Sequence, residues 1–172
     1  MATYKFVGDP GAGVPTFTQT GTWGTAAGQA PPVQFGHKAV AFDPTFGYAE
    51  FIFVKGSTNA AGELLQLVSN NNQARRAGSG TASAGPVGFA PAAMSATNVW
   101  GWVQVYGVFD SAIHSAACAN GAAIKMGTSA GHINAQTASN DTHQIGGMFN
   151  AGSNTASNNG SVHCFYPFYK GY

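Results

Sequence analysis

The sequence predicts an all-β fold, a single-domain antiparallel β-sandwich or barrel. Helix signals are nearly absent: no window places apolar residues at helical spacing between caps, and the best helical stretch, residues 60–68, is short and lies among turn formers. Runs rich in β-branched and aromatic residues recur instead, bounded by Gly, Pro and Asn. The chain has 172 residues, 44% of them apolar, which suffices for one hydrophobic core.

The first expected strands lie in residues 40–55. Residues 40–44 lead through a turn at Phe46 and Gly47 into residues 49–55 (AEFIFVK). The bulky side chains of that second run need at least one buried face, so it is predicted to be a strand.

Two further strands are expected to follow this pair. Residues 64–68 form the next strand, and a turn at the asparagines 70–72 leads into a return strand that carries Arg75 and Arg76.

Residues 99–107 (VWGWVQVYG) are the strongest strand of the chain. Its bulky residues, among them Trp100 and Trp102, alternate with valine and glycine, so neither face is plainly polar. A strand without a polar face belongs inside a sheet, and we therefore expect this one to be central.

Two turn signals organise the C-terminal part of the chain. Asn120 and Gly121 separate residues 113–119 from residues 122–126, and this dipeptide is the one that best specifies a tight type I′ hairpin. Residues 162–168 form the closing strand. Pro167 is expected to end it at a sheet edge, because proline cannot donate to the hydrogen-bond ladder.

The two ends of the chain differ from this pattern. Residues 1–35 are expected to form an extended N-terminal arm, since residues 8–35 are rich in Gly, Pro and Thr around the isolated aromatics Phe17 and Trp23. Residues 36–172 then form the β domain, whose C-terminal tail is aromatic. Such rings serve protein interfaces, or they fold back onto the domain's own core.

The charge composition favours a protein that is packed into an assembly. Only 8% of the residues are charged, whereas about a quarter is typical, and the formal net charge is +1. A surface of this kind has little self-repulsion to keep copies apart.

The same composition excludes several partners and compartments. Of the seven basic residues only Arg75 and Arg76 are adjacent, so no nucleic-acid partner is expected. No apolar run approaches the ~20 residues of a membrane span, and no secretory signal is apparent. We therefore expect assembly in a cytoplasm, with Cys118 and Cys164 reduced and buried.

Residues 127–131 (GTSAG) match the G-x-S-x-G motif of serine hydrolases, with His132, Asp141 and His143 nearby. The motif requires a strand that turns sharply into a helix, and residues 132–141 are poor helix formers. The spacing is also far tighter than in such folds, so a chance match is favoured. A hydrolase built on Ser129 is the least favoured of the functions considered.

Metal and cofactor sites are not indicated by the spacing of chemically active residues. His132, His143, His163 and Cys164 include no pair at the spacing of a zinc site. The six carboxylates are scattered, and no glycine-rich loop carries the Lys-Ser/Thr of a phosphate site. We predict no catalytic residue, no metal and no cofactor.

Four segments occur in an order that is similar to one group of proteins: residues 50–56 (EFIFVKG), 62–68, 85–90 (GPVGFA) and 100–105 (WGWVQV). They resemble small virion structural proteins of tailed phages, encoded near the major capsid protein and described as cement or decoration proteins. The similarity covers roughly residues 36–150 and consists of strand and turn patterns. It implies a jelly-roll-like or related β domain in many copies on an icosahedral shell.

The resemblance also implies partners and a location. The partners would be the major capsid protein and further copies of this chain, as a dimer or trimer, on the capsid exterior of the virion. The alternative is a head-fibre or receptor-binding module that recognises carbohydrate through exposed aromatic residues. The expected contact residues are the aromatics of the two ends: Phe17, Trp23, Phe165, Tyr166, Phe168, Tyr169 and Tyr172.

Overall fold

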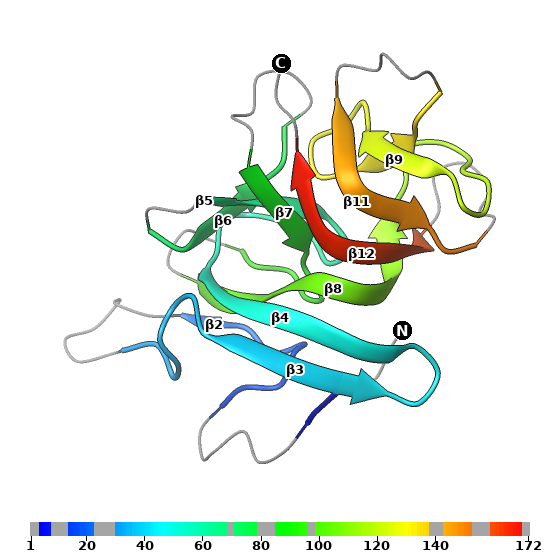
Figure 1. The fold of residues 1–172 in the computed structure, drawn as a ribbon. Helices are drawn as coiled ribbons and strands as arrows, with labels where there is room; N and C mark the ends of the chain where they lie inside the picture. Colours follow the sequence, from blue (N-terminus) through cyan, green and yellow to red (C-terminus); the bar gives the residue numbers. More distant parts are fainter. Residues whose placement is uncertain are drawn as a thin grey trace.

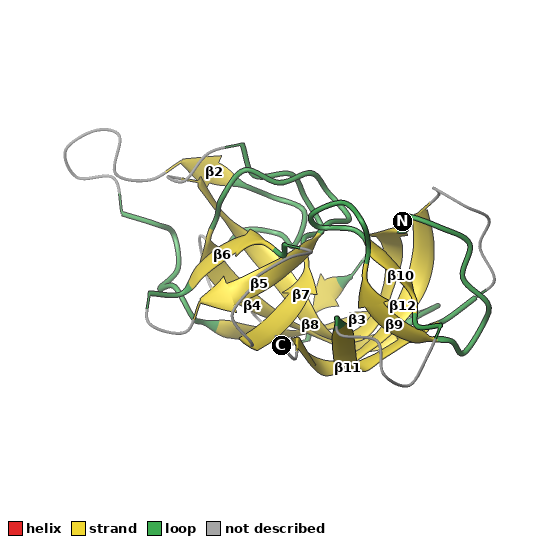
Figure 2. Ribbon diagram, turned by 90° about the horizontal axis from the view of Figure 1, so that it is seen from above, coloured by secondary structure: helices red, strands yellow, loops and turns green. Residues whose placement is uncertain are grey.

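The computed structural model describes residues 4–7, 14–22, 30–68, 71–78, 85–95, 99–137, 143–152 and 159–169. These residues form strands and loops without any helix, which confirms the all-β prediction (Figure 2). The strands are β1 (Lys5–Phe6), β2 (Gly21–Thr22), β3 (Lys38–Asp43), β4 (Gly47–Lys55), β5 (Leu64–Val68), β6 (Gln73–Arg76), β7 (Gly85–Phe89), β8 (Val99–Ile113), β9 (Ala123–Met126), β10 (Ile133–Ala135), β11 (Gln144–Asn150) and β12 (Asn159–Tyr169).

The long strand β8 connects the two halves of one mixed sheet. Its first part pairs with β4 and its second part with β12, so β3, β4, β8, β12 and β11 lie side by side (Figure 1). A second route runs from β4 through β6, β5 and β7 back to β8, and these pairings therefore form a closed circuit. The contact between β4 and β6 is parallel, whereas the other strand pairs are antiparallel.

Buried side chains form three clusters. The first cluster contains Phe89 stacked on Phe109, with ring centroids 4.9 Å apart. It also contains Cys118 and Cys164, which are buried thiols as expected, and burial raises the pKa of both. The second cluster gathers aromatic rings around Trp102, and the third is aliphatic and contains residues of β4, β5, β6 and β8.

The described part of residues 1–35 packs onto the sheet. β1 pairs with β3, and β2 pairs with β8. The ring of Phe17 stacks on Phe51 with centroids 4.0 Å apart, and Trp102 Nε1 donates a hydrogen bond of 3.1 Å to the carbonyl oxygen of Pro15. These N-terminal residues therefore complete the second cluster.

The bond between Trp102 and Pro15 allows a test of this packing. We expect Trp102→Phe to lower the free energy of unfolding by about 1–3 kcal/mol more than Trp100→Phe, because it leaves the buried carbonyl of Pro15 unsatisfied. Urea unfolding measures both variants, and Trp100→Phe controls for the lost ring volume. Equal losses in the two variants would contradict this role of the N-terminal segment.

The predicted type I′ hairpin at Asn120 and Gly121 is wrong, although the chain does turn there. β9 pairs with β10 and β11 and not with β8. A type I′ turn needs positive φ at both central residues, and only Gly121 has it, at +74°. The N–H of Gly121 donates to the carbonyl oxygen of Asn150 at 2.8 Å, so the turn positions β9 against β11.

The expectation that Pro167 marks a sheet edge is also wrong. β12 is an interior strand that pairs with β8 up to Phe165 and with β7 from Phe168 onward. Pro167 lies between these two pairings, where β11 also changes register after Gly146. A missing N–H is tolerated at such a bulge, and this is why the proline is accommodated inside the sheet.

Candidate interaction surface

Three of the expected contact residues are exposed on β12. The exposed fractions are 49% for Phe165, 55% for Tyr166 and 46% for Phe168. Large apolar side chains at these exposures are available to a partner, and a group of them on one surface usually has a function.

The other four expected contact residues are placed differently. Phe17 and Tyr169 are 4% and 2% exposed and belong to the second and first buried clusters. Their rings pack inside the chain, which is the alternative that the sequence left open. Trp23 and Tyr172 lie outside the described residues.

The strand register extends the exposed group across the sheet. Val40 lies opposite Glu50, Glu50 opposite Tyr106, and Tyr106 opposite Phe165. Residues directly opposite each other in antiparallel strands project from the same face. One row of side chains therefore crosses β3, β4, β8 and β12.

Neighbouring pairs widen this row. Phe42 lies opposite Tyr48, and His163 lies opposite both Val108 and Phe149. We call the whole group the aromatic face, and it consists of Val40, Phe42, Tyr48, Glu50, Tyr106, Val108, Phe149, His163, Phe165 and Tyr166. Its strands β3, β4, β8, β12 and β11 can be followed in order in Figure 1.

Exposure alternates along these strands. In β3, Ala39 and Ala41 are buried while Val40 and Phe42 are exposed, and in β12 Cys164 is buried next to the exposed Phe165. The inward positions of the sheet thus reach the core, whereas the aromatic face remains open. An antiparallel sheet normally presents polar residues on its open side, so large rings there need an explanation.

Contacts between neighbouring rings hold the aromatic face in place. Ring centroids are 5.0 Å apart for Phe42 and Tyr48, and 5.3 Å apart for Tyr106 and Tyr166. Phe165 packs edge-on against Tyr106 at 5.9 Å. Rings that are already ordered lose less conformational entropy on binding, so little ordering of these side chains would be needed for a contact at this surface.

Tyr166 is held in an unusual backbone conformation at the centre of the aromatic face. Its φ is +50°, in the left-handed region that residues other than glycine rarely adopt. The pKa of Tyr166 is raised to about 12. The larger cause is a side-chain hydrogen bond with Glu50, and the smaller cause is burial. The neutral phenol therefore satisfies the one carboxylate of the aromatic face, and backbone strain of this kind is found mainly at functional positions.

The G-x-S-x-G segment has a different context from that of a hydrolase. Residues 127–131 join β9 to β10, which pair antiparallel with each other, so the motif lies in a turn between two strands. Ser129 is exposed in this turn, and Asp141 lies outside the described residues. The strand-to-helix geometry that the motif requires is not present at this turn.

The described residues also bear on metal binding. No group of three or more His, Cys, Asp or Glu residues among them could hold an ion. None of the described segments is a helix that could cross a membrane.

Comparison with known proteins gives no match: no family model, no curated protein and no solved structure is significantly similar to this chain.

Proposed function

We propose that the protein is a structural component of a tailed-phage virion, bound to the capsid exterior, where it cements capsomers against the pressure of the packaged DNA. The observation that carries this proposal is the aromatic face, whose exposed rings cross β3, β4, β8, β12 and β11. The proposal includes a jelly-roll-like sandwich or barrel, for which the closed circuit of β4, β6, β5, β7 and β8 is the support.

The size of the aromatic face suits a protein partner. Five adjacent strands at a spacing of about 4.8 Å are about 20 Å wide. This width fits the apolar centre of a standard interface, which buries about 800 Å² per partner. Aromatic rings are also the side chains that such centres enrich.

The charge of the aromatic face suits close contact. Its one carboxylate, Glu50, interacts with Tyr166, so little charge has to be desolvated on binding. A protein that binds the assembled capsid lattice stabilises that lattice, because its binding free energy is added to the assembled state. Symmetric, multivalent contacts strengthen the effect. The major capsid protein is therefore the proposed partner, together with further copies of this chain.

Copy number on purified virions tests this function. Quantitative mass spectrometry should find many copies per particle, in a fixed ratio to the major capsid protein. A few copies at a vertex or tail would instead favour the alternative, a receptor- or carbohydrate-binding module that uses the same exposed rings.

A substitution in the aromatic face tests the surface itself. We expect Phe165→Ser to weaken binding to capsids about 30-fold, the effect of an aromatic hot spot worth about 2 kcal/mol. Capsid pull-down at several protein concentrations measures the affinity. Ser129→Ala, an exposed change in the turn between β9 and β10, is the control and should bind normally. Undiminished binding of a folded Phe165→Ser protein would reject this surface.

A further inference from the structure

A cavity lies between the N-terminal residues and the side of β4 and β8 that faces away from the aromatic face. Its volume is about 400 Å³. Phe51 and Phe109 line it, and they alternate along their strands with Glu50 and Val108 of the aromatic face. The cavity is therefore separate from the proposed capsid contact.

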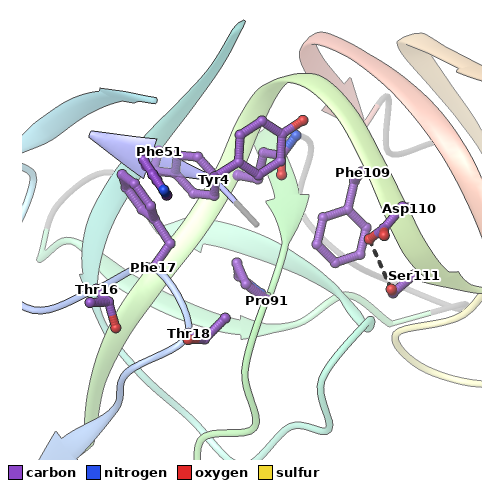
Figure 3. A pocket seen from close by; sticks show the side chains of 11 residues that line it. Tyr4, Thr16, Phe17, Thr18, Phe51, Pro91, Phe109, Asp110 and Ser111 are labelled. Carbon is purple, nitrogen blue, oxygen red and sulfur yellow. Dashed lines mark hydrogen bonds between the residues drawn. The ribbon is translucent and has the colours of Figure 1, made fainter. Parts of the chain in front are cut away.

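Aromatic rings form two opposite walls of the cavity. Figure 3 shows Tyr4, Phe17 and Phe51 on one side, with Phe109 on the other. Phe17 stacks on Phe51 at 4.0 Å, and Tyr4 packs edge-on against Phe51 at 5.5 Å. Phe109 stacks on Phe89, with ring centroids 4.9 Å apart. Because each of these rings is held by another ring, the walls need little reorganisation to receive a ligand.

Two polar side chains of the lining, Gln104 and Tyr4, are hydrogen-bonded to the protein itself. Gln104 is 1% exposed, and its Nε2 donates to the carbonyl oxygens of Tyr106 and Val108, at 3.2 and 3.0 Å. The Tyr4 hydroxyl donates to the same carbonyl oxygen of Val108. A ligand without polar groups therefore leaves these hydrogen bonds intact, which avoids the cost of an unsatisfied buried group.

The ionised side chains of the lining have opposite signs. They are Lys5, which is exposed on β1, and Asp110, which accepts a hydrogen bond of 2.9 Å from Ser111 Oγ. One positive and one negative charge give the lining no net formal charge. The lining as a whole thus favours neither sign of ligand, and a charged ligand would still lose hydration on entry.

The surroundings of the Tyr4 hydroxyl also disfavour an ionised group. Burial is the largest of the causes that raise the pKa of Tyr4 to about 12. Burial has this effect because a charge there is poorly hydrated. The same loss of hydration applies to an ionised ligand beside Tyr4.

We propose that this cavity binds an uncharged, apolar molecule of one or two rings, which lies between Phe17 and Phe109. A ring in this place packs against aromatic side chains on two sides, and aromatic pairs are favourable beyond the area that they bury. A cavity of about 150 Å³ lined by apolar side chains already holds benzene, so this one has room for one or two rings.

The test compares three probes that share one benzene ring: toluene, which is uncharged, benzylamine, a cation, and benzoate, an anion. Each is titrated into the full-length ¹⁵N-labelled protein, and amide shifts are followed by NMR. We expect toluene to give saturable shifts at Phe17, Phe51 and Phe109 and to bind about tenfold more tightly than either charged probe, because an ionised group loses hydration in the cavity. Equal or tighter binding of a charged probe, or no saturable toluene shift at these residues, would overturn the proposal.

Three variants locate the bound ring. Thr18 lines the cavity and is exposed, so Thr18→Trp places a large ring at its rim and should abolish toluene binding. Thr128→Trp adds the same ring in the turn between β9 and β10 and should bind toluene normally. Phe165→Ser removes an exposed ring from the aromatic face and should also leave the affinity unchanged. A folded Thr18→Trp protein with wild-type affinity, or a loss of affinity in either control, would contradict this location.

Discussion

Gly107→Ala is expected to lower the free energy of unfolding by about 3 kcal/mol or more. Gly107 has a φ of +91°, where an L-residue loses roughly 1–2 kcal/mol. A Cβ at this position would also collide with the carbonyl oxygen of Tyr48 and lie 3.0 Å from Cα of Ala49. Overpacking of this kind costs about 1–3 kcal/mol. Both contacting atoms belong to the backbone of β4, so the collision can be removed only if β4 and β8 move apart.

Gly47→Ala is the matched control, and urea unfolding measures both variants. Gly47 also has a positive φ, +78°, but a Cβ there would meet nothing within 4 Å. We expect this change to lower stability by only about 1–2 kcal/mol, the strain alone. Equal losses at the two glycines would show that the close approach of β4 and β8 at Gly107 does not matter.

Acidification is expected to destabilise the protein through His114. This side chain is 1% exposed, and neither ring nitrogen has a hydrogen-bond partner among the described residues. Burial lowers the pKa of His114 from 6.5 to about 4. Between these values the unfolded chain binds a proton that the folded chain does not, so the free energy of unfolding falls as the pH falls. Over the whole window the loss from this residue is about 3 kcal/mol.

His114→Leu isolates this contribution. The substitution retains an apolar side chain at the buried position and removes the titrating group. We expect the stability difference between wild type and variant to change by about 3 kcal/mol between pH 7 and pH 4, with the variant gaining relative to the wild type as the pH falls. If the free energies of unfolding of the wild type and the variant, measured with urea, change with pH in the same way, His114 is reached by water or by a hydrogen-bond partner.

Strands with strong local patterns could be predicted from the sequence. The alternating bulky residues of residues 49–55 and 99–107 indicate β4 and the first part of β8, because that pattern is local. The continuation of β8 to Ile113 could not be predicted in this way. β8 pairs with β4 from Trp100 to Tyr106 and with β12 from Tyr106 to Ile113, so its length is set by two different neighbouring strands.

β7 and β11 had no strand signal of their own because both contain glycines. Gly88 lies in β7 where a Cβ would be 2.5 Å from the carbonyl oxygen of Gln104, so the residue that weakens the local pattern is the one the packing requires. β11 (QIGGMFN) contains a bulge after Gly146, and its register is set by β12. Both features depend on a neighbouring strand that a local pattern does not reveal.

The aromatic C-terminal tail predicted Phe165 and Tyr166 of the aromatic face, together with the exposed Phe168, but the other residues of this face were missed. Val40, Phe42 and Phe149 join these rings only through strand register. In β3 the alanines point inward and the large residues outward, which reverses the usual expectation that the larger apolar side chain is the buried one. The alternation of alanines with larger apolar residues in β3 is the sequence signal that could have predicted this part of the aromatic face.

Photo-crosslinking from position 165 shows whether the aromatic face binds a protein partner in the virion. Phe165 is replaced by benzoylphenylalanine, and particles assembled with this protein are irradiated. We expect a covalent product with the major capsid protein, and none when the same group replaces the exposed Ser129. Particles that carry the protein but give no product from position 165, or the same product from both positions, would contradict it.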